Sequence, residues 1–375
     1  MGGGRPGPYT GAVTSPVSWD VAERVATWVG SRSSVFGPPG AGSLDDATVA
    51  QLEADFSEAT ATAEGLVIEA TGLRPAVGGT ALVVDRAGWV RANLSSFRRL
   101  LEPMLEQLDT SALRGPLAGA AGTATGAQLG LVLGWMATRV LGQYDLLLAE
   151  GDDTGGVVSY VGPDVVALER RHGFPARQFR LWIALHEVTH RCQFTGVPWL
   201  RGHFLSLVDQ AMTGMTPDPR RFAEALRRAA AAVRSGQNPL QEAGMLGLVA
   251  PPEQLEVIAR IQAMMSLLEG HGDITMDRAG ADAVPDAAWF SRVLRERRRR
   301  AGPAARVLQQ LVGIEAKMRQ YEQGERFIRA VEASAGGPGV LARAWEGPEM
   351  LPTMDEIRHP DTWVARVGPA RLATG

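Results

Sequence analysis

The sequence predicts a mainly α-helical protein with at most a small β element. Most of its segments place apolar residues three and four positions apart, which is the spacing of an amphipathic helix. Only the run VVSYVG, within residues 151–166, has the β-branched character of a short strand. Hydrophobic residues make up 45% of the 375 residues and charged residues 21%, values typical of a globular protein with a large core.

The ends of the chain differ in composition from its middle. Residues 1–17 are rich in glycine and proline and lack the apolar run of a secretory signal, so they predict a flexible tail. Residues 18–335 carry the helical patterns and predict a single body, with a candidate sub-boundary near residue 150. Residues 336–375 are again interrupted by glycine and proline, and we expect an irregular segment that packs on the body.

The first predicted helices begin at serines suited to cap them. Ser18 precedes one apolar stripe, and Ser43 precedes a second helix with an acidic first turn. Residues 81–84 form a short apolar opening, and helical periodicity follows the turn at Gly88.

Residues 115–138 contain no charged side chain and place Gly126, Gly130 and Gly134 four residues apart. The truly apolar part, residues 129–140, is too short to cross the ~30 Å hydrocarbon core of a bilayer. We therefore expect no membrane span here, but a buried helix whose small-residue face lets a second helix approach closely.

Glycine and proline also delimit the helices predicted further along the chain. Helical patterns cover residues 222–235, begin again after Pro251-Pro252, and return over residues 307–331. The stretch from Arg292 to Arg300 contains six arginines, for which a solvated helix face is the default interpretation. An anionic ligand or partner is the alternative.

The string His186-Glu187-Val188-Thr189-His190 is the most informative motif of the chain. Two histidines four residues apart on a helix project from nearly the same face, so one zinc ion could take both. Glu187 stands beside them as a candidate general base. The alternative is a helix whose histidines only pack or form hydrogen bonds. We favour the metal site, with one Zn²⁺ per chain.

A catalytic zinc takes three protein ligands and leaves a fourth position open. The downstream candidates for the third ligand are Glu269, His271 and His203, with Asp209 and Asp273 as weaker ones. We favour Glu269, because Asp273, four residues later, could then accept a hydrogen bond from a ligand histidine and fix its tautomer. On a regular helix His271 points about 200° away from Glu269, so the two are not expected to bind the same ion.

Gly270 and Gly272 flank His271 and each weaken a helix by ~1 kcal/mol relative to alanine. They allow two outcomes: the helix ends after Glu269, or its backbone approaches the metal closely. An ordinary carboxylate at a helix end is the alternative role for Glu269.

The residues of this site predict metal-assisted hydrolysis of an amide or peptide bond. Zinc lowers the pKa of its bound water to ~7, and Glu187 would take the proton of that water as it attacks the substrate carbonyl. The same carboxylate would then deliver the proton to the leaving group. A further hydrogen-bond donor to the oxyanion could come from His271, His203 or Tyr321.

Five segments follow one another in a characteristic order. They are VDRAGWVRANLSSF, LGQYDLLL, LHEVTHRCQF with VPWL after it, MSLLEGHGDITMDRAG, and QQLVGIEAKMRQYEQGERFI. Together they resemble the zincin-like metallopeptidase family typical of actinobacteria, over roughly residues 19–363. Members are often labelled as hydrolases, or as proteins associated with biosynthesis of a deazaflavin cofactor, and the second label records an association rather than an activity.

The resemblance implies a mostly helical zincin-like fold. It assigns the metal to His186 and His190, the base to Glu187, and the third ligand to the segment EGHGD. One position departs from the family's pattern, because Arg191 stands where such peptidases usually carry an uncharged residue. Helical geometry places Arg191 about 100° from His190, so we expect it at the rim of the site.

The overall charge and the single cysteine narrow the choice of partners and compartment. A net charge of −3 gives no global attraction to nucleic acid or to an anionic membrane. Cys192 is the sole cysteine, which excludes a disulfide within the chain and favours a reducing compartment such as the cytoplasm.

Three functions are compatible with these patterns. The first is a zinc-dependent peptidase or amidohydrolase, the second a catalytically inactive zinc-binding or interaction protein built on the same fold. The third is a protein that binds an anionic ligand through the arginines from Arg292 to Arg300.

Overall fold

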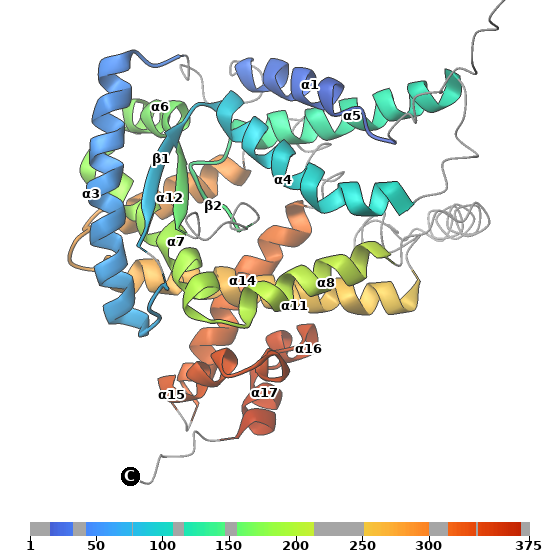
Figure 1. The fold of residues 1–375 in the computed structure, drawn as a ribbon. Helices are drawn as coiled ribbons and strands as arrows, with labels where there is room; N and C mark the ends of the chain where they lie inside the picture. The colour runs from blue at the N-terminus through green and yellow to red at the C-terminus, as the bar shows by residue number, and fades with distance from the viewer. Residues whose placement is uncertain are drawn as a thin grey trace, which may run out of the picture. The chain divides into compact units, whose positions relative to one another are not determined.

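The computed structural model describes residues 16–32, 43–76, 78–107, 116–146, 156–213, 251–299, 314–334 and 337–368. These residues are mainly helical and include a small three-stranded sheet, which confirms the predicted fold class (Figure 1). The helix predicted over residues 222–235 lies outside the described residues. Contacts divide the chain into two compact units, residues 1–40 with 86–139 and residues 41–85 with 140–375.

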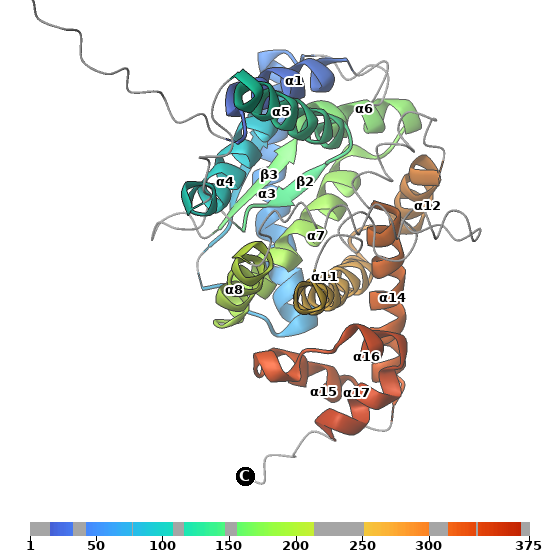
Figure 2. The ribbon, with the colours of Figure 1, turned by 90° about the vertical axis from the view of Figure 1, so that its right-hand side faces the viewer.

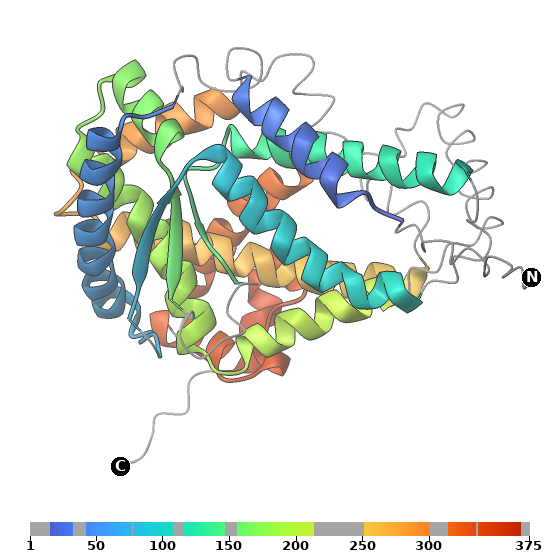
Figure 3. The same cartoon turned by 45° about the horizontal axis from the view of Figure 1, so that its top comes forward.

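The first unit is built from α1 (Trp19–Ser31), α4 (Arg86–Gln107) and α5 (Pro116–Ala137). Helices α1 and α5 lie side by side (Figures 1 and 3). A Cβ added at Gly130 or Gly134 would come within 2.5 Å of a backbone oxygen of α1, and Gly126 approaches the chain at Ser18 more closely still. The predicted close approach of a second helix is therefore confirmed. None of the described helices is both long and apolar enough to cross a membrane.

The second unit contains the sheet formed by β1 (Thr80–Val84), β2 (Gly142–Tyr144) and β3 (Val157–Val161). The strand order is β1-β3-β2, so β2 lies at an edge of the sheet. β1 runs parallel to β3 and β2 runs antiparallel to it. β3 is the strand that the run VVSYVG predicted, and β1 covers the apolar opening seen at residues 81–84.

Helix α7 (Ala176–Gly196), which carries the two histidines, is central to the second unit. It packs against α3 (Asp46–Thr71), α11 (Pro252–Ala279) and strand β2. Helix α3 is capped by Asp45, which accepts a hydrogen bond from the backbone N–H of Thr48 at 2.7 Å. The cap predicted at Ser43 is therefore wrong by two residues, because the helix begins at Asp46 and the residue directly before it, Asp45, supplies the carboxylate that accepts from the first turn.

The other elements of this unit surround α7 and α11. They are α6 (Gly162–His172), α8 (Leu200–Thr213), α12 (Ala287–Arg299), α14 (Ile314–Glu332), α15 (Pro338–Leu341), η2 (Ala342–Trp345), η3 (Pro348–Met350), α16 (Met354–Arg358) and α17 (Pro360–Val367). The last five are short and gather near one end of α14 (Figure 2). Trp363 anchors them: its side chain is fully buried against Phe327, and its indole N–H donates to the carbonyl of Met350.

Candidate metal centre

Helix α7 presents His186 and His190 from one face, as the four-residue spacing predicts. Their Nε2 atoms lie 3.2 Å apart, and the two ring planes are nearly perpendicular. The opposite side of the helix is anchored in the core, since Leu185 and Val188 are completely buried. Packing of that side into the core thus holds the backbone that carries the imidazoles.

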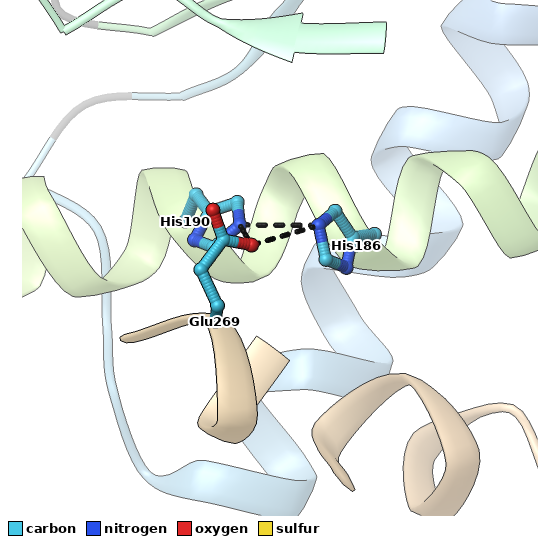
Figure 4. Close-up of side chains that lie close together, drawn as sticks. All are labelled: His186, His190 and Glu269. Atoms are coloured by element: carbon cyan, nitrogen blue, oxygen red, sulfur yellow. Dashed lines mark hydrogen bonds and ion pairs between the residues drawn. The ribbon is translucent and has the colours of Figure 1, made fainter. Parts of the chain in front are cut away.

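Glu269 reaches the two histidines from α11 (Figure 4). Its Oε2 lies 3.6 Å from Nε2 of His186 and 3.4 Å from Nε2 of His190. Within the described residues, these three side chains form the one cluster of histidine, cysteine and acidic groups arranged to hold a metal ion.

The spacing of the three donor atoms fits zinc. A tetrahedral zinc with ligand bonds of about 2.0–2.1 Å separates its ligand atoms by about 3.3 Å. The three observed separations, 3.2, 3.4 and 3.6 Å, lie close to that value. Two imidazoles and one carboxylate are also a donor set that catalytic zinc uses, and they leave one tetrahedral position for water or substrate.

The glycines beside Glu269 do not end the helix. α11 continues without a break to Ala279, so the alternative in which it stops after Glu269 is wrong. Gly272 faces the site, where an added Cβ would contact Cε1 of both His186 and His190 at 3.4 Å. A Cβ at Gly270 would clash with the backbone of α14 at Gly324, so this glycine serves the crossing of the two helices.

The second nitrogen of each imidazole faces a different partner. Nδ1 of His190 lies 2.9 Å from Oε1 of Gln193, which is hydrogen-bond distance. Nδ1 of His186 lies 3.7 Å from Oδ1 of Asp273, the separation of an ion pair rather than a hydrogen bond. Asp273 thus lies beside one of the two histidines, but the hydrogen bond predicted between Asp273 and such a histidine is not formed at this distance. Gln193 was not singled out from the sequence, although it follows His190 by three residues and must share its side of the helix.

His186, His190 and Glu269 lie close enough to shift pKa values within the cluster. Burial opposes the charged form of His186, but the contact with Glu269 and the charges of Glu187 and Asp273 outweigh it and raise the pKa of His186 to about 9. Burial would raise the pKa of Glu269, yet the two imidazoles hold that pKa well below its usual range. The cluster therefore holds a proton when it holds no metal.

Glu187 is fixed by the edge strand β2. Its side chain is 9% exposed, and its Oε2 accepts a hydrogen bond of 3.0 Å from the backbone N–H of Tyr144. Gly142, in the same strand, lies so close that an added Cβ would be 2.7 Å from Cγ of Glu187. The strand therefore fixes the position of the predicted base, and only glycine fits at its start.

Arg191 is completely buried, so the expectation that it lies at the rim of the site is wrong. Its guanidinium pairs with Glu64 of α3 and packs on the backbone at Gly79, where an added Cβ would be 2.5 Å from Nη1. The angle of about 100° between Arg191 and His190 around the helix correctly predicted that Arg191 points away from the two histidines. It did not reveal that α3 covers this direction and supplies a carboxylate to neutralise the charge.

The other predicted candidates lie apart from the three donors. His271 points away from them, with Nδ1 2.9 Å from Nε2 of Gln193 and its ring against Trp345. Burial and the nearby His190 lower the pKa of His271 to about 4. His203 meets the ring of Trp199 edge to face, and Asp209 belongs to α8. The side chains of Tyr321 and of the residues from Arg297 to Arg300 lie outside the described part of the chain.

Comparison with known proteins gave two matches. A family model described as zincin-like metallopeptidase matches residues 17–364. A crystal structure of an inferred hydrolase with a novel fold, from Chloroflexus aurantiacus, superposes with a TM-score of 0.67 and is 30% identical in sequence. That match covers 93% of this chain and 98% of the other. The curated proteins gave no significant match.

Proposed function

The chain belongs to the zincin-like metallopeptidase family, and we propose that it is a zinc-dependent hydrolase of amide or peptide bonds. The observation that carries the proposal is the triangle of donor atoms from His186, His190 and Glu269, whose sides match the edges of a zinc tetrahedron. The likeness to a structure described as an inferred hydrolase supports the same class of reaction.

Zinc bound by these residues would lower the pKa of a water ligand to ~7 and polarise a substrate carbonyl. Glu187 would receive the proton of the attacking water and return it to the leaving amine. Its two oxygens are not equivalent, because Oε2 is engaged by the backbone N–H of Tyr144. Oε1 is therefore the atom that we assign to proton transfer.

Elemental analysis of the purified protein tests the metal part of the proposal. We expect about one zinc per chain in the wild type, and its loss in His186→Ala and in Glu269→Ala. His359→Ala is the matched control, because His359 is exposed and its Nδ1 contacts Asp355 of α16, within the same local segment. Wild-type protein that stays free of zinc after reconstitution would contradict the proposal.

Peptide turnover tests the catalytic part. A pool of synthetic peptides, followed by mass spectrometry, should show hydrolysis that falls about 10²–10⁴-fold in Glu187→Gln. Glu253→Gln, in the exposed first turn of α11, should not change it. Zinc binding with no hydrolysis dependent on Glu187 would favour the alternative, a zinc-binding protein without catalytic activity.

The sequence suggested finer points that stay predictions. They are the cytoplasmic location, an actinobacterial source and an association with deazaflavin biosynthesis. The anionic ligand at the stretch from Arg292 to Arg300 has the same standing.

A further inference from the structure

We infer that Gln193 is a positioning residue, which fixes the tautomer of His190 so that the Nε2 lone pair of that ring points at the metal position. The inference rests on the proposed function, since it concerns how one of the proposed ligands is prepared for zinc. It assigns a role to Gln193 and, through it, to His271, neither of which is a proposed zinc ligand.

Gln193 is completely buried and uses both ends of its amide. Nε2 donates a hydrogen bond of 3.0 Å to the backbone carbonyl of Leu268 in α11. The same Nε2 lies 2.9 Å from Nδ1 of His271, and Oε1 lies 2.9 Å from Nδ1 of His190. The side chain of Gln193 therefore links α7 to α11, the two helices that carry the proposed zinc ligands.

The carbonyl of Leu268 decides which way the amide points. A carbonyl oxygen can only accept hydrogen bonds, so the end of Gln193 that faces it must be the NH₂ group. In the reverse orientation two oxygens would face each other in a buried site. The oxygen of Gln193 is therefore the atom that faces His190.

The orientation of the amide in turn determines where His190 carries its proton. An amide oxygen cannot donate, so Nδ1 of His190 must be the donor in this contact. In the neutral ring Nε2 then holds a free lone pair. That atom lies 3.4 Å from Oε2 of Glu269 and 3.2 Å from Nε2 of His186, where the zinc is proposed to bind. Hydrogen bonding at one imidazole nitrogen is a general way to select the nitrogen that binds metal.

His271 completes the arrangement as an acceptor. Because Nε2 of Gln193 donates, Nδ1 of His271 must accept, and the proton of that neutral ring lies on its Nε2. The ring is held edge-on against Trp345. Two acceptors, the Leu268 carbonyl and His271, thus hold the NH₂ end of Gln193 in place. By contrast, Asp273 stands at ion-pair distance from His186, so the two ligand rings are oriented by different means.

The tautomer can be measured in the wild-type protein without metal. Protein labelled with ¹⁵N in its histidines, with His190 assigned by comparison with His190→Ala, reports the proton position through the imidazole nitrogen shifts. We expect the proton of neutral His190 on Nδ1 and that of His271 on Nε2. A proton on Nε2 of His190, or one shared equally between its two nitrogens, would overturn the inference.

Zinc affinity of a matched pair of variants tests the consequence. Gln193→Met keeps the volume of the side chain and removes its hydrogen bonds, and we expect its zinc dissociation constant to rise about 10–100-fold. Gln254→Met is the control. Gln254, in α11, is a buried glutamine like Gln193, but its side chain donates to the carbonyl of Gln210, away from the site. Equal affinities of the two variants would contradict the inference.

Failure of the inference and failure of the proposed function give different results. If the wild type binds no zinc but His190 carries its proton on Nδ1, the inferred orientation stands and the metal site falls. If the wild type binds zinc and Gln193→Met binds it equally well, the metal site stands and the positioning role falls.

Discussion

The two sides of helix α7 both bury charged groups, but they combine them in opposite ways. On the side that faces α3, each buried arginine meets carboxylates: Arg191 pairs with Glu64, and Arg180 pairs with Asp55 and Glu169. On the side that faces α11, two imidazoles and a carboxylate turn lone pairs toward one point. Burial of charge is common to both sides, so it does not by itself indicate function.

The two sides differ in where the cation comes from. On the α3 side the protein itself supplies it as arginine, whereas the cluster on the α11 side takes it from solution. Arg180 forms two parallel hydrogen bonds of 2.8 Å with Glu169, which complete an ion pair within the fold. The donors of His186, His190 and Glu269 instead share a need for a cation, which is a proton in the metal-free protein and zinc in the proposed enzyme. A structural ion pair and a metal site can thus be told apart on one helix.

The largest effect that we expect from this comparison is the loss of the Arg180 ion pairs. Arg180→Met leaves the buried Glu169 and the partly buried Asp55 without this partner, which should lower the free energy of unfolding by about 3–5 kcal/mol. Urea unfolding measures this change. Arg177→Met is the control, because its pair with Glu58 is exposed and worth about 0–1 kcal/mol. A similar loss of unfolding free energy in Arg180→Met and Arg177→Met would contradict the distinction between buried and exposed ion pairs.

Zinc should stabilise the folded protein through the side of α7 that carries His186 and His190, and not through the side that carries the arginine ion pairs. At a free zinc concentration of 100 times the dissociation constant, the free energy of unfolding should rise by about 2.7 kcal/mol. The rise should vanish in His186→Ala and persist in Arg177→Met. Denaturant unfolding with and without zinc checks this, and stabilisation that survives in His186→Ala would show that zinc binds elsewhere.

A smaller effect concerns the pH dependence of the metal-free protein. The pKa of His186 rises to about 9 on folding from an ordinary value of 6.5, so the folded state binds the proton more tightly. This contribution to stability is fully present below pH 6.5 and is lost as the pH rises through 9. The shift alone corresponds to roughly 3 kcal/mol at ~1.4 kcal/mol per pKa unit. Solvent screening at the 24% exposed side chain reduces this to the order of 1–2 kcal/mol. Unfolding curves at pH 6.5 and 9.5 measure it. The same loss in His186→Ala would refute the assignment to His186.

The smallest effect that we expect is on the chemical reactivity of Cys192, which follows Arg191 in the sequence. The thiol is completely buried, and burial raises its pKa to about 11. Iodoacetamide at pH 8 should therefore leave it unmodified in the folded protein and alkylate it in denaturant, as mass spectrometry can show. Rapid modification of the folded protein would mean that the packing of α7 against α3 is open.

Local sequence patterns predicted the parts of the structure that depend on periodicity. The glycines of α5 predicted the close approach to α1, and the spacing of His186 and His190 predicted that their rings would meet. The same spacing argument placed His271 on another side of α11 from Glu269, where the structure has it. The single-body organisation of residues 18–335 stays a prediction.

What the sequence did not reveal depends on contacts between distant segments. The anchoring of Glu187 by Tyr144 joins residues far apart in the chain, and no local pattern marks a backbone N–H as a partner. Arg191 was expected at the rim because a helical angle gives a direction but not what lies there, which is Glu64. Gln193 could have been found, since a glutamine three residues after a ligand histidine can reach its ring.

X-ray absorption spectroscopy at the zinc edge tests the central claim most directly, because it reports the atoms bound to the metal. The account predicts nitrogen and oxygen neighbours at about 2.0–2.1 Å, with the outer-shell pattern of two imidazoles. A sulfur neighbour at about 2.3 Å, or a wild-type spectrum without imidazole, would contradict it.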